Sequence, residues 1–215
     1  MTTGAKKKST TLLLTGFGPF PGVPDNVSAR LVKELAQNVR ADFGNALTSN
    51  AGPVNVHAAI LPTEWQSAPS RLRALVKMIN PNISLHFGVA SGASGLRIET
   101  RAVNACLLED DAAGLQPASS VLQPGSDPFR HATLPFAQIV TRLTEMGLPA
   151  YLSDDAGTYL CNAVLYHALQ SERGTWMPER VGFIHVPDTL DGAPLTFDQA
   201  LSGAMEIVRV CLGSM

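Results

Sequence analysis

The sequence predicts an α/β fold, a single-domain three-layer α/β/α sandwich with a mostly parallel, twisted central sheet. Short apolar runs of strand length alternate along the chain with amphipathic segments of ten or more residues, which is the pattern of a sheet covered by helices on both faces. The 215 residues are 45% hydrophobic and 16% charged and contain no internal repeat, which fits one globular domain. We expect this domain to span residues 11–215, after a disordered tail of residues 1–10.

The first half of the chain supplies two strands and two helices. Residues 11–17 form an apolar run that ends in a loop rich in glycine and proline, which indicates a strand followed by a rigid turn. A helix begins next, with Asn26 or Ser28 as its N-cap and an apolar stripe on one face. Residues 54–61 read as a strand. Residues 67–79 form a helix that ends before an Asn-Pro pair, because the residue before proline resists the helical region.

The second half begins with the continuous apolar strand of residues 83–89. Residues 96–106 look extended, and residues 107–131 form a loop of a length that is usually functional or mobile in a compact domain. The remaining predicted elements are a helix over residues 135–146, a strand over 149–152, a helix that opens near Thr158, a strand over 181–186 and a helix over 196–212.

The stretch around Cys161 is the first candidate for chemistry. Gly157 permits a sharp turn and Thr158 is a good N-cap residue, so Cys161 falls in the first turn of a helix. There the helix dipole and free backbone N–H groups favour a thiolate over a thiol, which makes Cys161 a candidate nucleophile. On position alone, a small buried hydrophobic cysteine is the more common outcome.

His185 is the second candidate, because it ends the strand of residues 181–186, where α/β sheets place ligand and catalytic groups. Cys161 opens a helix just beyond its own strand, so we expect the two residues to meet at one edge of the sheet. A neutral imidazole there can remove the thiol proton and later protonate the leaving amine. Glu99 is the best-placed carboxylate by chain order to fix the imidazole tautomer. Taken singly, a histidine or glutamate at such a position is more often structural.

Charge and cysteine content argue against several function classes. A formal charge of -2 gives no reason to expect nucleic acid or an anionic membrane as partner, and no stretch reaches the ~20 apolar residues of a membrane span. Three widely spaced cysteines suggest neither a disulfide framework nor a zinc site, so we expect a cytoplasmic protein. Gly16–Pro21 lacks the third glycine of a dinucleotide fingerprint, and Ser91 and Ser94 complete no serine nucleophile elbow. The acidic run Glu109–Asp111 has no histidine at ligand spacing and is expected to be a solvated loop.

Four motifs occur in order between residues 12 and 187. Thr15–Gly22, followed by Asn26-Val27-Ser28, opens the series, and Glu99–Asn104, Ala156–Asn162 and Phe183–Pro187 follow. These stretches resemble the T-G-F-x-P-F-G-G-x-x-x-N-P-S, E-R-V-A-x-N, A-G-T-x-x-C-N and F-I-H-x-P motifs of the pyroglutamyl peptidases, also called pyrrolidone carboxyl peptidases. The motifs around the cysteine and the histidine are the most specific of the four.

The resemblance implies a cysteine peptidase that removes the N-terminal pyroglutamyl residue from peptides through a thioester acyl-enzyme, without metal or organic cofactor. Cys161 would be the nucleophile, His185 the base and acid, and Glu99 the residue that orients the imidazole. A homotetramer is also implied. The implied substrate-binding residues, with two phenylalanines against the flat lactam ring, are Phe17, Phe20, Asn26 and Leu160. For either phenylalanine, ordinary core packing is an equal alternative.

The chain also departs from the family pattern. Pro21 replaces the first glycine of the G-G pair, and Val27 replaces the proline of N-P-S. Residues 106–127 contain no arginine, although the family usually carries one after E-R-V-A-x-N; Arg97 or Arg101 could compensate. Two alternatives therefore stay open. One is a catalytically weak or inactive family member that binds a small molecule or peptide. The other is a phosphate-using nucleoside enzyme with a similar sheet, for which no cluster of basic ligands is evident.

Overall fold

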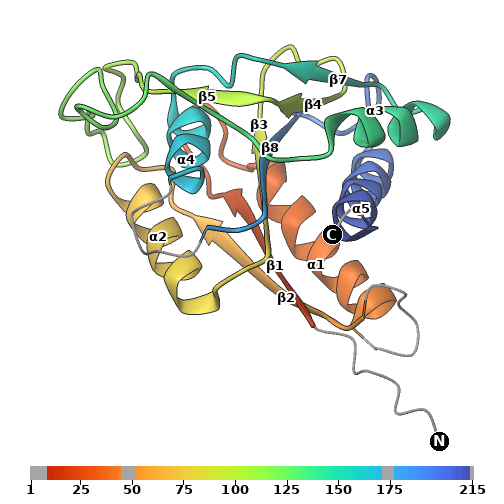
Figure 1. Ribbon diagram of the computed structural model, residues 1–215. Coiled ribbons are helices and arrows are strands. Elements are labelled where there is room, and N and C mark those ends of the chain that lie inside the picture. Colours follow the sequence, from red (N-terminus) through yellow and green to blue (C-terminus); the bar gives the residue numbers. More distant parts are fainter. Residues whose placement is uncertain (1–8, 45–51, 171–176, 214–215) are drawn as a thin grey trace, which may run out of the picture.

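The computed structural model describes residues 9–44, 52–170 and 177–213, and places a six-stranded sheet between two layers of helices (Figure 1). None of the described helices is long and apolar enough to cross a membrane. The predicted fold class, a three-layer α/β/α sandwich, is confirmed. Residues 1–8 of the predicted tail lie outside the described residues. One layer contains α1 (Val27–Phe43), α3 (Phe136–Glu145) and α5 (Phe197–Gly213), and the other contains α2 (Ser67–Ile79) and α4 (Leu160–Ala168).

The sheet has the strand order β2-β1-β3-β8-β4-β7. Its first four strands run parallel to one another, whereas β4 pairs with β8 antiparallel and with β7 parallel. The sheet is therefore mostly parallel, as predicted, but its last two strands run opposite to the rest. The six strands are β1 (Thr10–Phe17), β2 (Val54–Leu61), β3 (Ile83–Val89), β4 (Leu96–Glu99), β7 (Ala150–Ser153) and β8 (Arg180–Val186).

The extended segment of residues 96–106 is divided between two sheets. After β4 the chain continues as β5 (Arg101–Val103), which pairs with β6 (Phe129–His131) in a separate two-stranded ribbon. Thr100 connects the two sheets. Its backbone N–H donates to the Ser153 carbonyl at the end of β7, and its own carbonyl accepts from the Ala132 N–H after β6. Part of the segment predicted as a long loop is therefore a strand, and the ribbon continues the line of β4.

The sheet separates two apolar cores, and strand alternation decides which side chains enter each. On β3, Phe87 packs into the core beneath α1 and α5, so Gly88 faces the α2 and α4 layer. On β8, Ile184 enters the first core and Phe183 the second. His185, two residues after Phe183, therefore shares the α2 and α4 face with Gly88.

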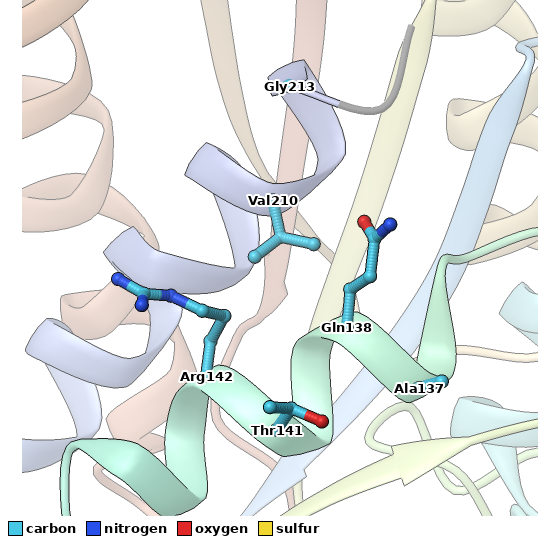
Figure 2. Close-up of a pocket in the computed structure, with 6 residues that line it drawn as sticks. All are labelled: Ala137, Gln138, Thr141, Arg142, Val210 and Gly213. Carbon is cyan, nitrogen blue, oxygen red and sulfur yellow. The ribbon is translucent and has the colours of Figure 1, made fainter.

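A shallow hollow of about 440 Å³ lies between α3 and α5 (Figure 2). It is on the face of the sheet opposite to His185, and none of the predicted site residues lines it. The site suggested by the sequence must therefore be sought on the α2 and α4 face. The lining residues are Ala137, Gln138, Thr141, Arg142, Val210 and Gly213.

Candidate active site

Glu99 and His185 meet across the antiparallel pair β4–β8. Arg97 lies opposite His185 in the ladder and Glu99 lies opposite Phe183, so Glu99 is a diagonal neighbour of His185 on the same face. Glu99 Oε1 is 2.7 Å from His185 Nδ1. Glu99 is fully buried and His185 is 2% exposed. The residues that the sequence analysis paired by chain order are thus in direct contact.

Cys161 reaches this face by a route that differs from the predicted one. The preceding strand β7 runs opposite to β8, so the two residues do not follow the carboxyl ends of parallel strands. Instead, residues 154–159 lead into α4, which packs over β3 and β8. A Cβ built on Gly88, which is in register with His185, would lie 2.9 Å from the Cys161 Sγ. The sulfur therefore lies over Gly88, next to the strand that carries the histidine.

The predicted N-cap and the predicted thiolate of Cys161 are both wrong. Helix α4 begins at Leu160 with Tyr159 as N-cap, and the Tyr159 side chain makes no capping hydrogen bond. Burial and the Glu99 charge raise the pKa of Cys161 to about 12, although Arg97 and a backbone hydrogen bond act to lower it. Loss of water around the thiolate outweighs the favourable helix start, so Cys161 is a neutral thiol at neutral pH. The residue keeps part of its surface exposed.

His185 carries a neutral imidazole in the folded protein. Burial lowers its pKa below the ordinary value; contact with Glu99 opposes this effect and the Arg97 charge adds to it. Because Nδ1 faces a carboxylate oxygen, Nδ1 carries the proton and Nε2 is left as the acceptor. The resting site therefore combines a neutral thiol with a neutral imidazole, which suits general-base activation rather than a preformed ion pair.

Arg97 is part of this cluster, whereas Arg101 lies outside it. The Arg97 Nε donates to Glu99 Oε1 at 2.7 Å, and its Nη2 donates to the carbonyl oxygen of Asp155 at 3.3 Å. The same Nη2 lies 3.3 Å from His185 Nδ1. Arg101 instead pairs with Asp154 at an exposed position. Of the two arginines named from the sequence, only Arg97 supplies a guanidinium to the Glu99–His185 pair.

Aromatic side chains gather near the start of α4. Phe17, only 2% exposed, lies in the core with its ring centroid 6.3 Å from that of Phe183. Phe20 is half-buried, with its centroid 6.4 Å from that of Tyr159, and Trp65 contacts Tyr159 edge-on at 5.1 Å. Trp65 and Tyr159 were not predicted as part of the site. Tyr159 occupies a variable position of the cysteine motif, and only the fold brings Trp65 to it.

Two of the predicted substrate-binding residues have clear structural roles. Asn26 is the N-cap of α1, and its Oδ1 accepts hydrogen bonds from the Ser28 backbone and hydroxyl. Its Nδ2 donates to the Gly18 carbonyl at 3.1 Å, which holds the turn between Phe17 and Phe20. Leu160 is 1% exposed and packs in the α2 and α4 core. Asn26 therefore shapes the loop, and Leu160 anchors the start of α4.

Asn162, which the sequence analysis did not single out for a role, fastens α4 to the segment after β4. Its Oδ1 accepts from the Val103 N–H at 2.8 Å, and its Nδ2 donates to the carbonyls of Val103 and Ala105 at 2.9 Å. The side chain is fully buried. The residue next to Cys161 thus fixes the position of α4 over the sheet. The signal was available, because asparagine follows cysteine in the matched motif.

The prediction that the acidic run Glu109–Asp111 is a solvated loop is wrong at Asp111. Asp111 is 2% exposed and accepts hydrogen bonds from the backbone N–H groups of Trp65, Ala113 and Leu115. These bonds lower the pKa of Asp111 against the opposing effect of burial. Asp111 therefore anchors its own turn and the chain at Trp65. Within residues 9–44, 52–170 and 177–213, no group of three His, Cys, Asp or Glu side chains is arranged to hold a metal ion.

The chain is similar to known peptidases along most of its length. The family model described as pyroglutamyl peptidase matches residues 10–199. A pyrrolidone-carboxylate peptidase of Pyrococcus furiosus is 35% identical over 177 residues, which cover 82% of this chain and 80% of that protein. One from Clavibacter michiganensis is 31% identical and covers 95% and 93%. A solved structure of pyrrolidone carboxyl peptidase from P. furiosus has a TM-score of 0.81 at 30% identity, covering 95% of this chain and 99% of that chain. With Cys161, His185 and Glu99 gathered on one face of the sheet, the chain belongs to the pyroglutamyl peptidase family.

Proposed function

We propose that this protein is a cysteine peptidase that hydrolyses the N-terminal pyroglutamyl residue from peptides. The observation that carries the proposal is the 2.7 Å contact between Glu99 and His185, with the Cys161 sulfur over the residue in register with that histidine. Such a set has the three parts of a thiol-peptidase site: a nucleophile, a base and a group that orients the base. The names of the relatives, pyrrolidone-carboxylate peptidases, support the choice of bond.

The reaction proposed here starts from the neutral pair. The Cys161 thiol gives its proton to Nε2 of His185 as the sulfur attacks the carbonyl carbon of the scissile amide. Glu99 stabilises the imidazolium that forms, and backbone N–H groups at the start of α4 hold the oxyanion. The tetrahedral intermediate collapses, and His185 protonates the departing peptide amine. His185 then removes a proton from water, which attacks the thioester, releases pyroglutamate and restores the thiol.

The lactam ring of the substrate is assigned to the aromatic group near the start of α4. A flat, uncharged ring suits such a slot. Phe20 and Tyr159 are the partly exposed members and would contact the ring, while the buried Phe17 supports the slot from below. Asn26 and Leu160 would act by holding the loop and the helix start. The homotetramer and the cytoplasmic location stay predictions.

The alternative of a non-catalytic binding protein rested on the absence of arginine from residues 106–127 and on the acidic character of that loop. Arg97 now supplies a guanidinium to the cluster, from the strand that precedes that segment. Arg97 is thus a candidate for the guanidinium that residues 106–127 lack, and no observation favours the inactive alternative.

The proposal is tested with a fluorogenic pyroglutamyl amide and, in parallel, the matching prolyl amide, which lacks the lactam carbonyl. We expect the wild-type protein to cleave only the first substrate and Cys161→Ser to cleave neither. Cys106→Ser is the matched control, because Cys106 lies in the same α2 and α4 core but its thiol donates a hydrogen bond to the carbonyl oxygen of Ser119. Failure of the wild type to cleave the pyroglutamyl amide, or equal activity of Cys161→Ser, would refute the proposal.

A further inference from the structure

Arg97 joins two parts of the active site that come from different segments of the chain. It lies on β4, directly opposite His185, and 23% of its side-chain surface is exposed. Its Nε donates to Glu99 on the same strand, and its Nη2 donates to the backbone of Asp155, in the segment that leads from β7 to Cys161. The guanidinium therefore spans the distance between the base on the sheet and the loop that delivers the nucleophile.

The contact with Glu99 determines which carboxylate oxygen orients the histidine. The His185 Nδ1–H and the Arg97 Nε–H both donate to Oε1 of Glu99, with N···O distances of 2.7 Å each. The other oxygen, Oε2, is buried and has no hydrogen-bond partner among the described residues. A buried carboxylate is held in place by the donors it has, and losing one of them leaves an uncompensated charge. Arg97 thus locks the rotamer of the group that sets the imidazole tautomer.

The contact between Arg97 and His185 acts in a different way. With Nδ1 protonated, Nη2 and Nδ1 are both donors, so their 3.3 Å approach is an electrostatic contact of a positive charge with a neutral ring. The Arg97 charge lowers the pKa of His185 and also that of Cys161. The charged or titratable groups around His185 are Glu99 and Arg97 on β4, Asp155 in the connecting segment and Cys161 on α4.

We propose that Arg97 is a positioning residue of the active site, which holds Glu99 against His185 and ties the segment at Asp155 to the sheet. This inference rests on the function proposed above for the assignment of the base. From the sequence, Arg97 could be named only as a residue able to replace the arginine missing from residues 106–127, without a defined role. The role is indirect, since Arg97 acts through Glu99, His185 and the loop and not on the reacting atoms.

The experiment compares Arg97→Gln, Arg97→Lys and Arg101→Gln. Two quantities are measured across pH: kcat/KM for the pyroglutamyl amide, and the rate of Cys161 alkylation by iodoacetamide, followed by mass spectrometry. In Arg97→Gln we expect kcat/KM at neutral pH to fall roughly 10- to 100-fold, and the acidic limb of its pH profile to move to higher pH. Without the positive charge the imidazole protonates more readily and the thiol ionises less readily, so alkylation slows.

The other two variants separate charge from geometry. Arg97→Lys keeps the charge but cannot reach Glu99 and Asp155 together, so we expect a reduced kcat with the acidic limb where the wild type has it. Arg101→Gln removes an exposed contact to the neighbouring Asp154 and is expected to leave both profiles unchanged. If Arg97→Gln does not fold, as judged by circular dichroism, Arg97→Lys decides through the separation of kcat from KM. A lowered kcat with an unchanged KM supports the inference, and any other result overturns it.

Two results would overturn the inference outright. One is an Arg97→Gln protein with wild-type kinetics. The other is a loss of activity of equal size at every pH with unchanged alkylation, which is what a purely structural role predicts. If the wild type fails to cleave the pyroglutamyl amide, the proposed function is refuted. The alkylation rates then still decide the role of Arg97, because they need no substrate.

Discussion

A methyl group at Gly88 is expected to displace the sulfur of Cys161. Gly88 lies on β3 in register with His185, and a Cβ there would lie 2.9 Å from the Cys161 Sγ and 2.8 Å from the Phe183 ring. Non-bonded heavy atoms prefer about 3.5–4.0 Å, so the sulfur must move by roughly 0.6–1 Å. A misplacement of about 1 Å can reduce turnover ~100-fold, equivalent to about 2.7 kcal/mol of transition-state stabilisation. Overpacking adds a loss of about 1–3 kcal/mol in the free energy of unfolding.

The assay for Gly88→Ala combines kcat/KM for the pyroglutamyl amide, the alkylation rate of Cys161 and the urea midpoint. Gly203→Ala on α5 is the matched control, because its Cβ would meet the Leu96 side chain in the core on the other face of the sheet. We expect both variants to lose stability, but only Gly88→Ala to lose activity per folded molecule. Equal kcat/KM in Gly88→Ala and wild type would show that the sulfur does not lie over Gly88.

Three further predictions concern His86, Asn162 and Cys161. Burial lowers the pKa of His86 from 6.5 to about 3. Between these pH values the unfolded chain binds a proton at His86 that the folded protein does not. The free energy of unfolding should therefore fall as pH decreases from 6.5 towards 3, by up to ~1.4 kcal/mol per pH unit from this group. Urea unfolding at several pH values checks this, and an equally steep fall in His86→Gln would contradict it. Asn162→Asp keeps the shape of the side chain but removes the donor to the carbonyls of Val103 and Ala105, so the free energy of unfolding should fall by about 2–4 kcal/mol. A change below about 0.5 kcal/mol in urea unfolding would show that Asn162 does not hold α4 to this segment. Because the pKa of Cys161 is about 12, its alkylation rate should still rise above pH 9, and a plateau near neutral pH would indicate a preformed thiolate.

The bounds of several strands and helices could be predicted from local sequence signals. Residues 54–61, 67–79 and 83–89 were predicted with the bounds that the structure has, because proline, asparagine and glycine interrupt the apolar runs on either side. The pairing of β5 with β6 was not predicted, since it joins residues about 30 positions apart across a polar segment. Local patterns carry no information about such a partner, nor about the reversed direction of β4 and β7.

The electrostatic state of the site also lay beyond the sequence. A cysteine at a helix start is activated if water or cations surround it, but here the thiol is buried beside the Glu99 carboxylate. The helix dipole is a property of one segment and can be inferred from the sequence. Burial depends on α4, β3 and β8 together, and it reversed the expected direction of the pKa shift.

The sequence by itself determined the fold class and indicated the candidate reacting groups, because periodicity, caps and motif spacing are local and Cys161, His185 and Glu99 each lie in a recognisable motif. Only the tertiary structure decided how these groups work together. The antiparallel register of β4 against β8 places Arg97 opposite His185 and Glu99 beside it, and the glycine at position 88 leaves room for the sulfur. Contacts of this kind depend on which strands become neighbours and in which direction they run, and chain order does not specify either.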